Sequence, residues 1–387
     1  MNNLSVKIVE SIAEIPAEQW NLMVTDNHPF TQHAFLHALE KHDCVGKKFG
    51  WLPKHLAVYQ NQQLIAAMPC YEKHNNYGEF VFDQAWEQAW NQIGLPYYPK
   101  LVSAIPYTPV MGQRILTKQD LSITEKEYLL ELIYQTLTDA CDHQQMSGAH
   151  VLFANYEQQK WLNHQQDQHL YKRLGYQFHW RNQNFTSFED FLSTLKSKKR
   201  NNIIRERKSF TESNIHFRTL NGHQATEQDW ANFDYFYQKT FLEKWSTPTL
   251  NRAFFEEIGK TMPENIVLVL ADIDDECIAG ALMFKSDTHL YGRHWGTIKE
   301  VSNLHFETCF YQGIEYAIEN GLQVFEPGAG GEHKIARGFT PIEIESFHWL
   351  PLNPFGENLD KFIDQEALAV RDYLKQCESM SPYKQPI

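Results

Sequence analysis

The segment IVLVLADIDDECIAGALMF, residues 266–284, predicts two neighbouring strands joined by a tight turn. Its first six residues are apolar and rich in β-branched side chains, residues 272–276 have the acidic composition of a turn, and apolar residues resume at Cys277. After a Ser-Asp turn, residues 289–295 predict a third strand. The three strands together indicate an antiparallel meander.

Helical and strand patterns continue on both sides of this meander. Downstream, apolar residues recur at helical spacing over residues 303–320, and residues 322–325 and 342–349 predict two further strands. Upstream, residues 124–143 predict a helix and residues 150–154 a buried strand. Helices that alternate with mostly antiparallel strands indicate a mixed α/β fold.

An internal repeat indicates that this fold occurs twice. Four short motifs recur in the same order, with offsets between 210 and 219 residues. The paired segments are 11–20 and 224–230, 34–40 and 253–258, 64–68 and 277–281, and Tyr77-Gly78 and Tyr291-Gly292. Four matches in one order favour duplication over chance. With 387 residues and no long Gly, Ser or Pro-rich linker, the sequence predicts two domains, 1–182 and 183–387, that pack together.

Composition and charge exclude several classes of protein. The net charge is −13 and the sequence pI is near 5.8, so we do not expect a nucleic-acid coat protein or a DNA partner. The longest apolar run, residues 266–271, is too short to span a membrane, and the N-terminus has no signal-peptide pattern, so we expect a cytoplasmic protein. The six cysteines form no C-x-x-C pair and the 18 histidines show no zinc-ligand spacing, so we expect no metal site.

Several segments resemble those of GNAT-type N-acyltransferases. Residues 171–177, YKRLGYQ, are similar to the L-Y-x-x-x-G-F entry to the last GNAT hairpin, and residues 334–339 occupy the equivalent place in the second copy. Residues 106–114, 195–203 and 325–334 resemble stretches of the bacterial FemAB-like proteins. The resemblance implies a tandem of two GNAT-like folds with mixed, mostly antiparallel sheets flanked by helices.

The same resemblance implies an activity. It indicates an N-acyltransferase that moves an acyl or aminoacyl group to a small-molecule or peptide amine by direct, base-assisted attack. Because the second domain holds more of the polar clusters, we expect the active site there or in the cleft between the two copies. The resemblance also places Arg114 near the substrate groove as an anion clamp. GNAT enzymes that use acetyl-CoA usually carry an R/Q-x-x-G-x-G/A pyrophosphate loop, which neither copy has. We therefore expect no tightly bound cofactor, and the donor stays open between an acyl-CoA and an aminoacyl-tRNA.

A basic run over residues 196–208 predicts an anion-binding helix. It holds seven basic residues and one acid. An apolar helical stripe over residues 188–195 continues through Lys199, and a lysine on the inward side of a helix is costly unless it meets an anion. Lys199, Arg200 and Arg205 are therefore candidate substrate-binding residues. The alternative is a solvated helix face with a lysine whose ammonium reaches water.

The segment FEPGAGGEHKIARGF, residues 325–339, carries the candidate catalytic residues. Three glycines within four residues predict a turn whose N–H groups bind an anion or oxyanion. Glu332 and His333 are the candidate bases that take a proton from an amine, and Lys334 and Arg337 are candidates for holding an anionic group. The remaining candidate binding residues here are Glu326, Gly328, Gly330 and Gly331. The alternative is a glycine turn with exposed charges.

The segment YGRHW, residues 291–295, predicts another part of the site. Tyr291, Arg293 and Trp295 alternate along a predicted strand and so share one face. An arginine and a tyrosine there suit carboxylate binding and protonation of a leaving group. The alternative is strand packing with a structural arginine, and for His294 we expect packing only.

Three hypotheses about function remain. The first is a direct-transfer acyltransferase, and the second is an aminoacyl-tRNA-dependent transferase that acts on a cell-wall precursor. The third is a non-catalytic module that recognises a peptidoglycan precursor or a nucleotide-sugar. The pair Glu332 and His333 favours an enzyme, because a degenerate site need not keep a base beside its anion loop. Pure nucleic-acid binding fits the basic helix but not the net charge.

Overall fold

The computed structural model describes residues 3–385. The chain forms two compact units, one of Met1–Gly175 with Glu343–Arg371 (unit 1) and one of Tyr176–Ile342 with Asp372–Ile387 (unit 2). The division at 175/176 falls seven residues before the boundary expected from the sequence, and unit 1 takes back a late segment of the chain. Three elements contain residues of both units: β9 (Leu170–Arg181), β15 (Thr340–Trp349) and α12 (Glu357–Ser379).

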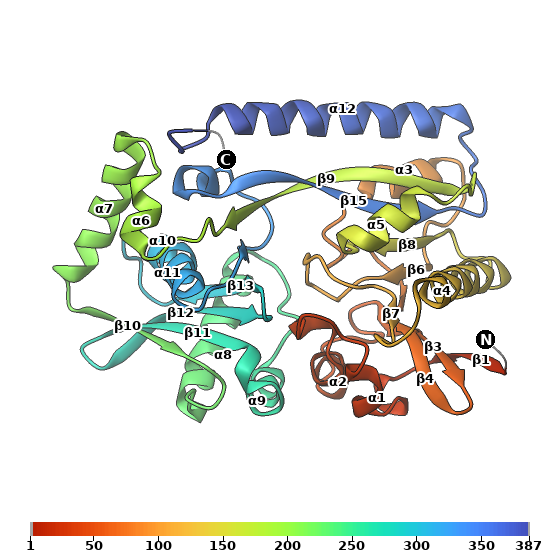
Figure 1. Ribbon diagram of the computed structural model, residues 1–387, viewed down its shortest axis with the longest axis horizontal. Helices are drawn as coiled ribbons and strands as arrows, with labels where there is room; N and C mark the ends of the chain where they lie inside the picture. The colour runs from red at the N-terminus through yellow and green to blue at the C-terminus, as the bar shows by residue number, and fades with distance from the viewer. Residues whose placement is uncertain (1–2, 386–387) are drawn as a thin grey trace. The chain divides into compact units, whose positions relative to one another are not determined.

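Unit 1 contains two groups of paired strands and the helices that cover them (Figure 1). The first group has the order β1-β3-β4-β7, with β1 (Leu4–Val9), β3 (His55–Gln60), β4 (Gln63–Met68) and β7 (Leu116–Thr117), all antiparallel. The second has the order β15-β8-β6-β5-β2, with β8 (Ala149–Leu152), β6 (Lys100–Ser103), β5 (Tyr71–Lys73) and β2 (Trp51–Pro53). The α-helices are α1 (Ala17–Asn21), α2 (His33–Lys41), α3 (Gln84–Gln92), α4 (Ile123–His143) and α5 (Tyr156–Asn163).

Unit 2 is built on strands in the order β10-β11-β12-β13-β14-β9. The strands are β10 (Ile215–Leu220), β11 (Ile266–Ile273), β12 (Glu276–Lys285), β13 (His289–Thr297) and β14 (Val324–Glu326). Two helices, α8 (Glu227–Glu243) and α9 (Arg252–Thr261), cover one face, and the other helices cover the opposite face (Figure 1). These are α6 (Phe188–Ser193), α7 (Ser197–Thr211), α10 (Leu304–Phe306), the π-helical turn η4 (Glu307–Tyr311) and α11 (Gln312–Glu319), and the 3-10 turn η5 (Glu332–Arg337) follows β14.

The predicted meander is confirmed. Strands β11 and β12 pair antiparallel down to Ile273 and Glu276, so Asp274 and Asp275 form a two-residue turn. Both have positive φ, 48° and 66°, which suits the twist of a hairpin and which aspartate tolerates better than most residues. Apolar side chains of the meander form the core of unit 2 with those of η4 and α11.

The duplicated α/β fold is also confirmed, because both units repeat one supersecondary unit. In unit 1, β6 and β8 pair parallel and α4 connects them, and in unit 2, β13 and β14 pair parallel and η4 and α11 connect them. A parallel pair needs such a helical crossover. The two pairs matter for function, since the point where parallel strands part is where α/β folds commonly place a site.

Strand β13 packs closely against α8, and its pairing with β14 ends well before β13 itself ends. A Cβ atom at Gly296 would lie 2.3 Å from the carbonyl oxygen of Phe236 on α8, so only glycine fits there. On its other edge β13 pairs with β14 only from His289 to Tyr291, although it continues to Thr297. The last six residues of β13 therefore lie where the strand pair has opened.

Candidate active site in unit 2

A cavity of about 230 Å³ lies where β13 and β14 part. Strand β12 supplies apolar wall residues, β13 and the loop after β14 supply the sides, and η4 and η5 close it. Its lining residues are Ala281, Leu282, Met283, Gly292, Arg293, His294, Trp295, His305, Cys309, Phe310, Pro327, Ala329, His333 and Lys334. The cavity thus combines an apolar wall with several basic side chains, as ligand sites commonly do.

A β-bulge turns Arg293 into the cavity. Leu282 pairs with His294 and Met283 with Gly292, so Arg293 is an extra residue on β13. The bulge breaks the predicted alternation, because Arg293 and His294 both line the cavity while Tyr291 is buried in the strand pair. The ring of His294 also packs, as expected, with its centroid 5.0 Å from that of Tyr237 in an edge-to-face contact. Burial lowers the pKa of Arg293 to about 10, although the charge of Glu326 acts in the opposite direction.

Glu326 is buried at the end of β14, in register with Tyr291. Its carboxylate lies 4.0 Å from Nε2 of His179, whose pKa burial lowers to about 3. Burial also lowers the pKa of His294 to about 3, and Arg293 adds to this effect. Arg293 thus has the neutral imidazole of His294 beside it, and the carboxylate of Glu326 lies near enough to act on its charge.

Lys334 is buried at the cavity and is held by the glycine turn. Its Nζ donates hydrogen bonds to the carbonyl oxygens of Gly328, at 2.7 Å, and Ala329, at 3.2 Å. Gly328, Gly330 and Gly331 all have positive φ, so glycine is what allows the turn to wrap around the ammonium. Burial lowers the pKa of Lys334 to about 8, and the charge of Arg293 acts in the same direction. The turn predicted to bind an anion through N–H groups therefore uses two carbonyls to hold a cation.

His333 and Glu332, the predicted catalytic pair, have different surroundings. His333 lines the cavity, with its ring centroid 5.6 Å from that of Phe310 and 6.1 Å from that of His305. Burial and the charges of Lys334 and Arg337 lower the pKa of His333. Glu332 is exposed outside the cavity and accepts a hydrogen bond of 2.8 Å from the hydroxyl of Tyr373. Of the two predicted catalytic residues, only His333 is thus placed to exchange a proton with a ligand in the cavity.

Arg337 fixes η5 instead of lining the cavity. Its guanidinium stacks 3.3 Å from the ring centroid of Phe306, and its Nη1 donates to the backbone carbonyl of His333 at 2.9 Å. Its Nη2 donates to the carboxylate of Glu206 on α7 at 3.1 Å, and the hydroxyl of Tyr311 donates to the same carboxylate. These bonds tie η5 to α7 and η4, so Arg337 is a positioning residue for His333.

Two residues that line the cavity, His305 and Cys309, were not among the site residues predicted from the sequence. His305 has a pKa of about 4 because it is buried, and the charges of His333, Arg337 and Lys334 lower it further. Burial also raises the pKa of the Cys309 thiol, so it is not a thiolate nucleophile. Both come from the helix predicted over 303–320, in which η4 inserts a wider turn. Such π-helical turns occur frequently at functional sites.

The basic helix does not bring its predicted residues to this cavity. Lys199 and Arg200 are half-buried, Arg205 is exposed, and the buried residues of α7 are Ile203 and Phe210. The apolar stripe of α6 ends at Ser193, and α7 begins only at Ser197, so the stripe does not continue through Lys199. Lys199 is half-buried one turn before Ile203 and does not line this cavity, and its role in anion binding stays a prediction.

Arg114 lies fully buried in unit 1 and serves the fold. Its Nε, Nη2 and Nη1 donate to the carbonyl oxygens of Leu152, Val110 and Gln113, at 2.7, 2.6 and 3.2 Å. Because the guanidinium of Arg114 donates to three backbone carbonyls, Arg114 does not fit the expected role of an anion clamp.

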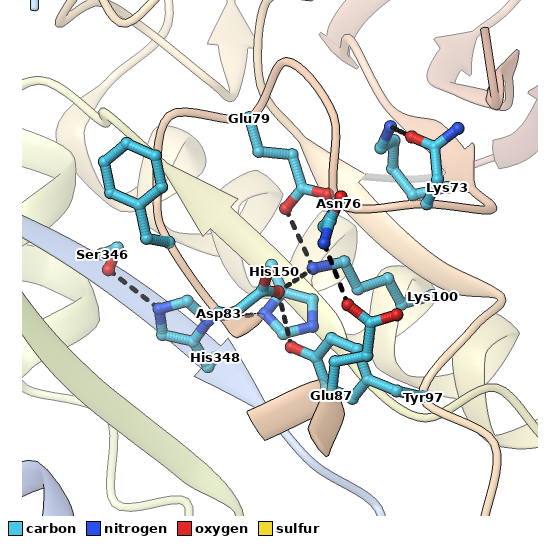
Figure 2. Close-up of polar contacts among 12 residues, drawn as sticks. Lys73, Asn76, Glu79, Asp83, Glu87, Tyr97, Lys100, His150, Ser346 and His348 are labelled. Carbon is cyan, nitrogen blue, oxygen red and sulfur yellow. Dashed lines mark hydrogen bonds and ion pairs between the residues drawn. The ribbon is translucent and has the colours of Figure 1, made fainter. Parts of the chain in front are cut away.

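Unit 1 carries a buried charge network of its own (Figure 2). Lys100 donates to Glu79, at 2.9 Å, and to Asp83, which also accepts from the hydroxyl of Tyr97 at 2.7 Å. Lys73 lies opposite Lys100 on the neighbouring strand, and burial lowers its pKa to about 7. We call Lys73, Glu79, Asp83 and Lys100 the unit 1 network. All four are at most 4% exposed, so the network is sealed from solvent.

Known structures share the fold at low identity. The C-terminal DUF2156 domain of an Agrobacterium fabrum protein has a TM-score of 0.56 and 9% identity over 92% of this chain and 96% of its own. L-PGS from Bacillus licheniformis has 0.53 and 9% over 91% and 97%, and FemX has 0.51 and 10% over 93% and 100%. At these identities the likeness shows the fold alone. No curated protein matches the sequence.

Residues 3–385 lack two structural features. No helix there is long and apolar enough to cross a membrane. No group of three or more His, Cys, Asp or Glu side chains there is arranged to hold a metal ion. The FemAB-like family, described by its role in peptidoglycan biosynthesis and recognition, matches residues 11–385. Since this match covers nearly the whole sequence, the chain belongs to the FemAB-like family.

Proposed function

We propose that this chain is a transferase that moves an acyl or aminoacyl group onto an amine in the cavity of unit 2. One observation carries the proposal: His333, Lys334 and Arg293 converge on a small cavity at the point where β13 leaves β14. Acyl transfer needs a base for the attacking amine, a partner for the oxyanion and a proton for the leaving group. These three side chains can supply all of them.

His333 is the base in this proposal. Its lowered pKa keeps the imidazole neutral near pH 7, so it can accept a proton from the amine. The nitrogen then attacks the carbonyl carbon of the donor, the N–C bond forms, and the carbonyl electron pair moves onto oxygen. Arg337, which donates to the carbonyl of His333, keeps the imidazole in place for this step.

Lys334 and Arg293 are the partners of the oxyanion. An ammonium has three donors, and Lys334 uses two of them on the glycine turn, which leaves one for a ligand. Lys334 is buried and Arg293 half-buried in the cavity wall, where electrostatic stabilisation is stronger than in water. When the intermediate collapses, the bond to the leaving oxygen or sulfur breaks, and Lys334, with a pKa of about 8, gives that atom a proton.

The donor that fits best is an aminoacyl ester. The segment between β13 and α10, residues 298–303, contains no glycine, and its Lys299 is paired with Glu276 at 2.5 Å. A pyrophosphate loop of the acetyl-CoA type is therefore missing at the place where the helix begins. The Agrobacterium fabrum neighbour carries the name of a lysylphosphatidylglycerol synthetase, and the family description names peptidoglycan. Both support an aminoacyl-tRNA donor and a peptidoglycan-precursor amine as acceptor.

The test is transfer of a labelled amino acid from charged tRNA to a UDP-linked muropeptide, with acyl-CoAs as alternative donors. We expect His333→Gln to lower the rate about 10²–10⁴-fold and Lys334→Met about 10²–10³-fold. Glu332→Gln is the matched control, because Glu332 lies outside the cavity, and its rate should stay within a few-fold of wild type. Full activity in both cavity variants would overturn the assignment. Saturable muropeptide binding without turnover from any donor would favour a recognition module instead.

A further inference from the structure

A second, larger cavity of about 470 Å³ lies in unit 2 and has no part in the proposed reaction. It is formed by α6, one face of α7, β10 and the start of η4. Its volume falls within the range of about 300–1,000 Å³ that small-molecule sites usually have. Its apolar lining residues are Phe188, Leu192, Ile204, Phe210, Ile215 and Phe217. The walls therefore suit a hydrocarbon group.

The charged groups deep in this cavity satisfy one another. Glu307 is 2% exposed and accepts from Nε of Arg207, at 3.2 and 3.3 Å, and from the side-chain amide of Gln312, at 2.8 Å. Arg207 also donates to Glu315 at 2.6 Å, and its guanidinium lies 4.3 Å from the ring centroid of Phe188. Arg207 and Glu307 at the inner end of the cavity neutralise each other, so neither needs a charged group of a ligand as its partner. The buried part of a ligand is expected to be apolar.

The outer edge of the cavity is basic along α7. Ile204, Arg207, Lys208 and Thr211 line it at helical spacing, and the same face continues back to Arg200. Ile204 is apolar but 46% exposed, and it lies one turn from Arg200 and one turn from Lys208 along α7. The side chain of Lys208 is 68% exposed and forms an ion pair with the surface residue Glu212. One acid, Glu189, lies on the opposite edge. This arrangement complements an anionic head group that follows an apolar chain.

The wall shared with the active cavity is a second indication of function. The π-helical turn η4 contributes Glu307 to this cavity and Cys309 and Phe310 to the active cavity. A π-helical turn is less favourable than a regular α-helix, so it is usually retained where a function needs it. Because η4 lines both cavities, a purely structural role does not account well for its π-helical geometry.

We propose that this cavity binds a single-chain amphiphile with an anionic head group, the hydrocarbon chain among the phenylalanines and the head group at Lys208. The proposal does not depend on the transferase reaction. The probe is laurate, measured by isothermal titration calorimetry at concentrations below micelle formation, with the full chain. We expect saturable binding with one site, weaker at higher salt because a cation at the outer edge holds the head group. Dodecyl maltoside, with the same chain and a neutral head, should bind at least tenfold more weakly.

Two pairs of variants test the placement. Lys208→Glu should lower laurate affinity at least tenfold, and Lys198→Glu, the same charge change on another face of α7, should change it less than twofold. Ile204→Glu should abolish binding, and Ile123→Glu, at an exposed isoleucine of unit 1, should not. All four side chains are largely exposed, so folding is not at risk. The proposal is overturned by absent monomer binding, by binding to phosphatidylglycerol vesicles alone, by equal affinity for dodecyl maltoside, or by equal effects of Lys208→Glu and Lys198→Glu.

Discussion

Replacing Lys100 by methionine should destabilise unit 1 more than any surface charge change. The side chain of Lys100 is fully buried between two carboxylates that are themselves 2% and 4% exposed. Methionine fills nearly the same volume, so the change mainly removes the ammonium. Removing one partner of a buried ion pair costs about 3–5 kcal/mol, because the other charge stays buried without compensation. Two carboxylates lose their cation here, so we expect the upper part of that range.

The measurement is urea unfolding followed by tryptophan fluorescence, since Trp86 and Trp90 lie buried in unit 1. Lys172→Met is the control, because the Lys172–Glu345 pair is partly exposed and such pairs contribute about 0–1 kcal/mol. The triple variant Lys100→Met, Glu79→Gln, Asp83→Asn should recover at least half of the loss, since neither buried carboxylate remains without its cation. A loss below about 1 kcal/mol for Lys100→Met, or one equal to that of Lys172→Met, would refute this account of the unit 1 network.

The pH dependence of the same variant has a definite sign. Burial already raises the pKa of Glu79 in the wild-type protein, and loss of Lys100 removes the largest charge that lowers it. The folded variant then binds protons that the unfolded chain releases, so its stability rises as pH falls through the raised pKa. The difference in unfolding free energy between variant and wild type should therefore be smaller at pH 5 than at pH 8. A difference that grows on acidification would contradict the assignment of uncompensated carboxylates.

Three further predictions concern the site and its support. The transfer rate should show no acidic limb between pH 6.5 and 8, because His333 is neutral there, and an alkaline limb near pH 8, where Lys334 loses its proton; this limb should move upward in Lys334→Arg. Gly296→Ala should cost at least about 1–3 kcal/mol in urea unfolding, since its Cβ would lie 2.3 Å from the Phe236 carbonyl oxygen, whereas Gly175→Ala, whose Cβ would meet only the Ile344 carbonyl oxygen at 3.9 Å, is the milder change. Arg114→Met should lower the melting temperature of the protein and leave the Michaelis constants of the remaining folded enzyme unchanged, because its guanidinium binds backbone carbonyls.

The fold followed from patterns that act locally. The 266–284 meander, the helix after it and its end at Gly321, with a φ of 66°, all depend on residues close in sequence. Because four motifs recur in the same order, each local prediction for one copy applied to the other as well. The two-copy fold could therefore be inferred without an alignment. The boundary did not follow, because residues 343–371 return to unit 1 through β15 and α12, and no composition change marks such a return.

The site was predictable only in part, since side-chain direction there depends on irregular backbone. The glycine turn indicated Lys334 and His333, but a bulge at Arg293 and the wider turn η4 decide what else lines the cavity. The alternation of β13 thus misplaced Tyr291. Glu332 and His333 are neighbours in sequence and both exposed, yet His333 lines the cavity while Glu332 accepts a hydrogen bond from Tyr373 outside it. The unit 1 network had no signal at all, because its members are scattered and each is an ordinary surface residue type.

Comparison of the two copies supports placing the proposed reaction in the second. In unit 1, residues 104–110 are all buried beyond the β6–β8 pair, and Gly112 forms a parallel bridge to Ala154, so that strand pair is bridged again beyond its end. The guanidinium of Arg114 then fastens this segment to Leu152 and Val110. In unit 2, β13 and β14 also share three residue pairs, as β6 and β8 do in unit 1, but beyond them the extra residue Arg293 of β13 lines a cavity. The space beyond the parallel pair is thus occupied by buried residues of the chain in unit 1, whereas in unit 2 it remains a cavity lined by Arg293, His333 and Lys334. This difference between the copies supports the proposal that the first copy uses the space for packing and the second uses it for binding.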